Sequence, residues 1–311
     1  MKKVIGIGAV IAVVVVGIIF LAHRDGDNRA SEASHQVTAE GDDAHGEVGP
    51  QVTATQSRRT SALSNILNSS SSKEFALSQL VPEAERGRAL YVLAVGEVVD
   101  ACGLLYMPAE HGIDRVVPLV VRSDGMWKRR YAEHAKFCGE RTDLDARAEK
   151  LVANLQVRMN TLANQGDRIA QMYDAMADTG GRLSDSNAGI ALDILQDARA
   201  DGESVRRAAH ALVSSESESI RRLDKELFGA AYSPDGKENI KSMAAQAYAC
   251  SRGVYCGPSG HFQRTSCLLT GACDVFLPLN DYVRKYRLSG ADYALMQQYA
   301  QRLAALVGDS R

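Results

Sequence analysis

The chain has 311 residues, of which 45% are hydrophobic and 24% charged, and its formal net charge is −2. So small a charge provides no field that steers polyanions, and the basic run Lys128-Arg129-Arg130 is too short for a nucleic-acid surface. We therefore expect no nucleic-acid partner. The roughly 250 residues after the first 57 are enough for a substantial core, in one domain or two.

The chain begins with a candidate membrane anchor. After Met1-Lys2-Lys3, residues 4–22 run without a polar side chain. At about 1.5 Å per residue, this run nearly spans the ~30 Å hydrocarbon core of a bilayer. A cleaved signal peptide is the alternative, but bulky Phe20 stands where a cut after Ala22 needs a small residue. We predict an uncleaved transmembrane helix over 4–22, in contact with lipid, and a cytoplasmic tip over 1–3.

The charges around this run predict its orientation. Two lysines precede it and two arginines, Arg24 and Arg29, follow it, but the free amino terminus adds to the front and the next stretch is acidic. We expect a single-pass inner-membrane protein with its N-terminus inside and its body in the periplasm or outside the cytoplasm. Gly8 and Ala12 form a small-xxx-small pair that allows a homo-oligomer.

Residues 23–57 are predicted to be a flexible linker. They contain few large apolar side chains, so burial cannot offset the entropy of ordering them. A chain of this length spans on the order of 30–35 Å, which separates the body from the membrane surface.

The remainder, 58–311, is predicted to be a helical body. Apolar residues recur at steps of three and four through 144–162, 169–176, 188–195, 205–212, 220–227 and 293–307. Ser289, followed three residues later by Asp292, resembles a capping pair for the last helix. Only residues 115–122 have β-branched density, and Pro118 within them suits an edge or an extended loop. The expected fold class is all-α, either a helical bundle or an irregular solenoid.

Six cysteines suggest three disulfides in an oxidising compartment. Cys102 and Cys138 are expected to join two helices, one from about Pro82 to Leu105 and one from about Gly125 to Gly139. The other four form a separate hairpin over 239–275. A nested pairing, Cys250 with Cys273 and Cys256 with Cys267, is the first choice. Cys250 with Cys267 and Cys256 with Cys273 stays open, since four cysteines allow three pairings.

Two segments of the sequence resemble segments of known protein families. Residues 162–171 (LANQGDRIAQ) resemble the Leu-Ala-x-x-Gly-Asp-x-x-Ala-Gln joint of Sel1-like helical repeats, in one copy. That resemblance implies a helix pair with Gly ending the first helix. The segment with Ala249-Cys250, Cys256-Gly257, Cys267 and Gly271-Ala272-Cys273 is similar to one found in bacterial exported helical proteins. No activity comes with it.

No catalytic or metal motif stands out. His134 and Cys138 are four apart on one helix face, but Cys102 explains Cys138 better than zinc does, so we predict no metal site. His261 is a potential base without a Ser or Cys nucleophile at a recognisable spacing. Glu97 and Asp100 share one helix face, which we expect to face water.

We therefore expect a non-enzymatic envelope protein that contacts a protein partner through helical surfaces and binds no cofactor. An enzyme acting on cell-wall material, with acids such as Glu97 or Glu110 at work, is the first alternative. A component of a secretion or transport assembly is the second.

Overall fold

The computed structural model describes residues 61–107, 112–229 and 232–308. These residues form helices and no strand, which confirms the all-α class. The predicted anchor (4–22) and linker (23–57) lie outside them. Within the described ranges, none of the helices has the length and apolar character needed to cross a membrane.

Helices of the first half alternate with short turns. In chain order they are α2 Ala62–Ser69, α3 Lys73–Glu85, α4 Ala89–Tyr106, α5 Ile113–Val116, α6 Leu119–Ser123, α7 Gly125–Cys138, α8 Asp143–Ala153 and α9 Leu155–Asn164.

The second half continues in the same manner. Its helices are α10 Arg168–Ala177, the 3-10 turn η1 Asp185–Asn187, α11 Ala188–Gln196, α12 Gly202–Val213, α13 Glu218–Phe228, α14 Pro234–Ser251, α15 His261–Thr270, α16 Leu279–Tyr286 and α17 Gly290–Val307.

Capping side chains explain where many of these helices begin. Ser72 Oγ accepts a hydrogen bond from the N–H of Phe75, and Asp167 Oδ1 accepts one from Ala170. Ser289 caps α17 through the N–H of Asp292, as the sequence predicts. Each bond satisfies a first-turn N–H that has no partner within its own helix, a contribution of about 1 kcal/mol.

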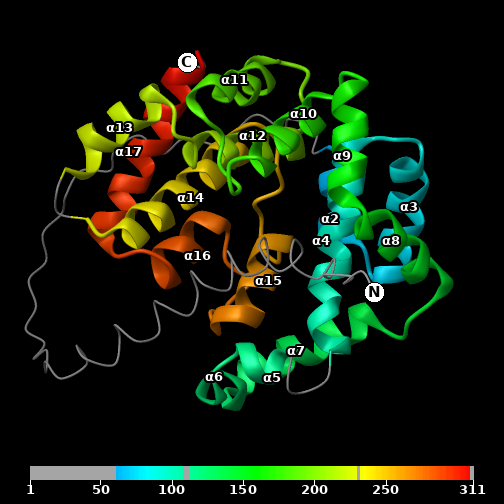
Figure 1. Ribbon diagram of the computed structural model, residues 1–311. Helices are drawn as coiled ribbons and strands as arrows, with labels where there is room; N and C mark the ends of the chain where they lie inside the picture. The colour runs from blue at the N-terminus through cyan, green and yellow to red at the C-terminus, as the bar shows by residue number, and fades with distance from the viewer. Residues whose placement is uncertain (1–60, 108–111, 230–231, 309–311) are drawn as a thin grey trace, which may run out of the picture.

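The helices pack in two groups joined by a helical hairpin (Figure 1). On one side α3, α4 and α8 contact one another; on the other, α12 and α17 flank α14, with α11 against α12. The hairpin of α9 and α10 contacts α4 and also α11 and α12. One hydrophobic core runs through both groups, and a smaller one around Trp127 joins α5 and α7 to the α15 region.

Close packing fixes the turn between α3 and α4. Gly87 adopts φ +82°, and a Cβ there would lie 3.2 Å from Leu162 Cδ2 on α9. A side chain at this position is therefore strained twice, by its backbone and by its neighbour. The chain breaks here, so Pro82 lies in the last turn of α3 and not at the start of the next helix, where the sequence placed it.

Two other predictions differ from the structure. The single apolar face of 144–162 is divided between α8 and α9, because Asn154 leaves the helical conformation at φ −117° and ψ 35°. The β-branched residues 115–122 form the short helices α5 and α6, which Pro118 separates. Val117 lies between the two short helices and is buried in the small core. An exposed edge strand would not need to bury it.

The disulfides are Cys102–Cys138, Cys250–Cys256 and Cys267–Cys273. The first confirms the predicted link between α4 and α7. The nested pairing of the last four is wrong, as is its alternative, because each cysteine pairs with its near neighbour. A glycine at positive φ lies inside each short loop, Gly253 at +103° and Gly271 at +77°, and reverses the chain within six residues.

Peptide mapping of the unreduced protein tests this connectivity. Digestion under conditions that prevent thiol exchange should yield the three linked peptide pairs above by mass spectrometry. A fragment joining Cys250 to Cys273, or Cys256 to Cys267, would contradict it. Reduced and alkylated protein is the control, since it should release all six cysteines separately.

Candidate functional site

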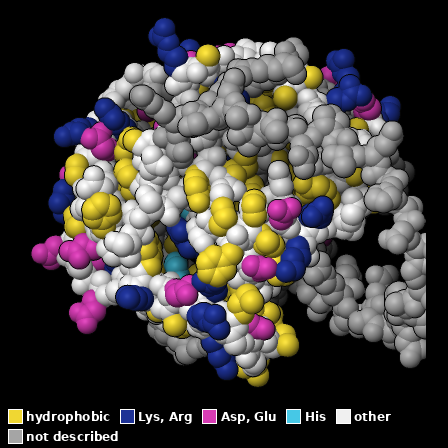
Figure 2. Space-filling view, turned by 180° about the vertical axis from the view of Figure 1, so that it is seen from behind, with side chains coloured by type: hydrophobic (Ala, Val, Ile, Leu, Met, Phe, Trp, Pro, Cys, Tyr) yellow, Lys and Arg dark blue, Asp and Glu magenta, His cyan; other side chains and the backbone are white. Residues whose placement is uncertain are grey.

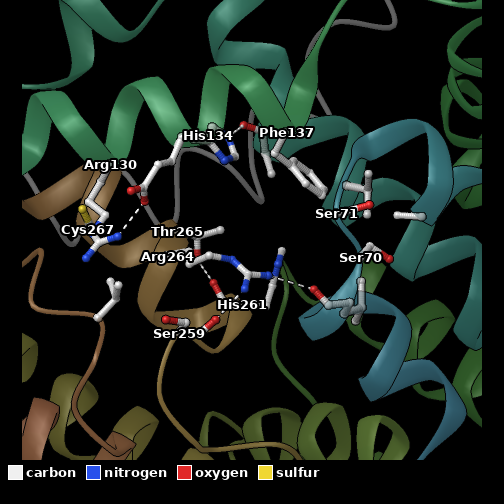
Figure 3. A pocket seen from close by; sticks show the side chains of 16 residues that line it. Ser70, Ser71, Arg130, His134, Phe137, Ser259, His261, Arg264, Thr265 and Cys267 are labelled. Atoms are coloured by element: carbon white, nitrogen blue, oxygen red, sulfur yellow. Dashed lines mark hydrogen bonds and ion pairs between the residues drawn. The ribbon is translucent and has the colours of Figure 1, made fainter.

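A cavity of about 280 Å³ opens between α7 and α15, with α2, α3 and α4 completing its wall. In Figure 3, His134 and Phe137 extend from α7, and His261 and Arg264 face them from α15. The volume suits a small group such as an amino-acid side chain. Helices far apart in the sequence thus build one site.

Arg264 crosses the cavity and binds the end of α2. Its Nη2 donates to the carbonyl oxygen of Leu67 at 3.0 Å, and its Nη1 donates to that of Asn68 at 3.2 Å and to that of Ser259. A second hydrogen bond runs in the opposite direction. Asn68 Oδ1 accepts it from the N–H of His261, at the N-terminus of α15, over 2.7 Å. Each helix therefore satisfies groups that the other leaves unbonded.

Arg264 has donor capacity left over. In the described part of the chain it forms no ion pair with a carboxylate, and its three bonds go to backbone carbonyls. A guanidinium has five N–H donors, so two remain. Burial lowers the pKa of Arg264, but an arginine remains charged at neutral pH. The cavity therefore contains a cation with unused donors.

The two histidines of the cavity are neutral. The Nε2 of His134 lies 2.7 Å from the carbonyl oxygen of Ala101, which can only accept, so Nε2 carries the proton and Nδ1 is an acceptor. Burial lowers the pKa of His134, and burial lowers that of His261 to about 4. At pH 7 neither ring adds positive charge, and both offer lone pairs.

The remaining charges at the rim neutralise each other. Arg130 Nη1 lies 2.6 Å from Glu133 Oε2, and the guanidinium sits 4.4 Å from the centre of the Phe276 ring. Glu133 is the lone acid among the lining residues. The net charge that faces the cavity is therefore the single positive charge of Arg264.

Behind the cavity, Glu97 is held in an ionic cluster and does not face open water as the sequence suggested. Its Oε1 accepts from Arg206 Nη2 at 2.7 Å and from Arg207 Nη2 at 2.5 Å. Arg206 also binds Glu203, and Arg207 binds the hydroxyl of Tyr173 at 2.8 Å. Burial alone would raise the pKa of Glu97, but the two arginines lower it to about 2.

This cluster weakens the case for acid–base catalysis by Glu97. A carboxylate with so low a pKa is a poor proton acceptor at neutral pH. Burial and the charge of Glu97 raise the pKa of nearby Asp100 to about 6. Glu110 lies outside the described residues.

Cys102, His134 and Cys138 do come together, with their ligand atoms within 4.8 Å of one another. Both sulfurs belong to the disulfide, so neither is a thiolate that can bind zinc. His134 Nε2 lies 3.6 Å from Cys138 Sγ and packs beside the bridge. In this oxidised state the group is a cross-link.

Sequence patterns missed Arg264, Asn68 and Ser259. One signal existed for Arg264, which follows His261 by three residues and so shares its face of α15. Nothing in the sequence indicates that Asn68, almost 200 residues earlier, caps that helix. Ser259 stands out only by its backbone, at φ +60°, which is uncommon for a residue other than glycine.

No family model, curated protein or solved structure matches the chain. The turn between α9 and α10 has Gly166 at φ +91° and Asp167 as the cap of α10. The Sel1-like resemblance stays a prediction.

Replacing Glu97 by Gln tests the ionic cluster. The change leaves the buried guanidinium of Arg207 without a counter-charge, while the partly exposed Arg206 keeps Glu203, so we expect the free energy of unfolding to fall by about 3 kcal/mol. Urea unfolding at pH 7 measures it.

The matched control is Glu226→Gln, which removes an exposed partner of Arg302 at 2.8 Å. That change should cost less than about 0.5 kcal/mol. Equal losses in the two variants would show that the buried cluster contributes no more than a surface ion pair.

Proposed function

We propose that this chain is a membrane-tethered, non-enzymatic binding protein of the cell envelope, and that the cavity between α7 and α15 receives a carboxylate of its partner. One observation carries the proposal: Arg264 lines the cavity with two N–H donors unused and no carboxylate paired to it in the described ranges. A charge-assisted hydrogen bond from a guanidinium to a carboxylate is among the stronger polar contacts.

The surroundings of Arg264 support an acidic ligand. Val98 and Phe137 supply apolar wall beside the guanidinium. Glu133 is engaged by Arg130 and so repels an incoming anion less. The tether is proposed from the apolar run at 4–22, and the oxidising compartment from the cysteine pairs.

Filling the cavity tests this function. Ala101 lines it from α4, and Ala101→Leu adds volume there without touching the bonds of Arg264. We would titrate the full chain in detergent with N-acetyl dipeptides bearing a free C-terminal carboxylate, and with their amidated counterparts, by calorimetry. Wild-type protein should bind the carboxylates in preference, and Ala101→Leu should weaken binding by about tenfold or more, over 1.4 kcal/mol.

Ala132→Leu is the matched control, since Ala132 is exposed on α7 and the same change there should leave affinity unaltered. Equal affinity for the carboxylate and amidated dipeptides would contradict the proposal. Unchanged affinity of Ala101→Leu for the carboxylate dipeptides would also contradict it.

An enzyme acting on cell-wall material is the second candidate, favoured by one observation. Ser259, in its unusual backbone conformation, lines the same cavity as neutral His261. It ranks second because no hydrogen bond joins its hydroxyl to an imidazole in the part of the chain that the structure describes. Covalent labelling by a fluorophosphonate that is lost in Ser259→Ala would favour it.

A secretion or transport component is the third candidate, and it depends on packing of the anchor through Gly8 and Ala12.

A further inference from the structure

The end of the molecule formed by residues 115–130 exposes apolar side chains; we call it the α6 tip. Leu119 is 68% exposed, Val120 78% and Met126 47%. They are three of the nine large hydrophobic residues that are exposed in the described chain, yet they fall within eight consecutive positions. In Figure 1 this segment projects from the rest of the body beside α15.

The tip is held rigidly with these side chains outward. Val117 and Trp127 are buried in the small core, and the indole N–H of Trp127 donates to the carbonyl oxygen of Leu268 at 3.0 Å. Val121 packs against Gly271, where an added Cβ would lie 2.9 Å from Val121 Cγ1. Because Val117, Val121 and Trp127 point inward, Leu119, Val120 and Met126 have no core to enter.

Basic side chains surround the apolar ones. Residues 115–130 contain five arginines and lysines and one acid, Asp124, whose Oδ1 is used to cap α7. Arg115, Lys128 and Arg129 are exposed and form no ion pair within the described ranges. Figure 2 shows hydrophobic and basic side chains gathered at this lower end of the molecule.

We propose that the α6 tip docks on a bilayer surface that carries anionic lipid. Leu119, Val120 and Met126 enter the boundary between headgroups and acyl chains, while Arg115, Lys128 and Arg129 meet the phosphates. Apolar residues framed by basic ones are the pattern of interfacial membrane binding, and each basic residue near an anionic surface adds affinity. A projecting apolar end also suits insertion into a bilayer better than it suits a flat protein surface.

Tethering makes this docking feasible. Thirty-eight residues, 23–60, separate the predicted anchor from the first described residue, and such a chain spans on the order of 35 Å if flexible. The bilayer is then always within reach, and even weak docking is favoured by the high local concentration. This step rests on the proposed membrane tether, whereas carboxylate binding in the cavity is independent of it and is measured separately.

A probe at the tip tests the proposal. All six cysteines are in disulfides, so Leu119→Cys provides the one thiol that an environment-sensitive dye can label. The labelled full chain would be placed in nanodiscs of phosphatidylcholine with and without phosphatidylglycerol. We expect the emission to shift to the blue with phosphatidylglycerol. Val157→Cys, an equally exposed aliphatic position at 69% on α9, is the control and should not shift.

Charge removal completes the test. In the labelled Leu119→Cys protein, Arg115→Gln, Lys128→Gln and Arg129→Gln together should lower the ratio of docked to undocked body on the order of 100-fold, about fivefold for each charge. Identical emission in the two nanodiscs would overturn the proposal. A shift that depends on the number of chains per nanodisc and not on phosphatidylglycerol would also overturn it, because the tip would then meet a second copy. Failure of the tether would appear as chains that do not enter nanodiscs at all.

Discussion

The arrangement of the body depends on the buried ion cluster of Glu97, Arg206 and Arg207. It joins α4, in the first group of helices, to α12, in the second, across more than 100 residues of sequence. The buried Arg207 and the partly exposed Arg206 are tolerated because Glu97, Glu203 and Tyr173 accept hydrogen bonds from them. Removal of Glu97 would leave Arg207 without an ion-pair partner in the described residues, so these groups constrain one another. Hydrophobic contacts alone permit small slips between helices, whereas these directional bonds define one register.

The cavity lies between that cluster and the Cys102–Cys138 disulfide. Helix α4 serves both, since Val98 and Ala101 face the cavity while Glu97 faces α12. The Cys102–Cys138 bridge fixes α7 against the same helix. The cavity wall is thus supported by a disulfide on one side and by the ionic cluster behind it. Rigid support of this type favours selective binding, because little ordering remains to be done when a ligand enters.

Local signals predicted much of the fold. The cap at Ser289, the helix over 125–138 and the link between Cys102 and Cys138 all follow from spacing along one helix or a few turns. The pairing of the last four cysteines was missed although its signal is present, in the glycines that reverse the chain inside each six-residue loop. Glu97 was placed in water because its partners lie 110 residues further along, where no local pattern indicates them. Long-range electrostatics limited the prediction of the site more than helix propensity did.

The reciprocal bonds between α2 and α15 have a consequence for the order of assembly. Asn68 binds His261, and Arg264 binds Leu67, so contacts that complete the first described helix come from residues almost 200 positions later. Helix α2, with 8 residues, is too short to persist alone. We therefore expect its last turn to be completed only when α15 packs against it. Because α15 supplies one wall of the cavity, truncated chains that lack α15 cannot form it.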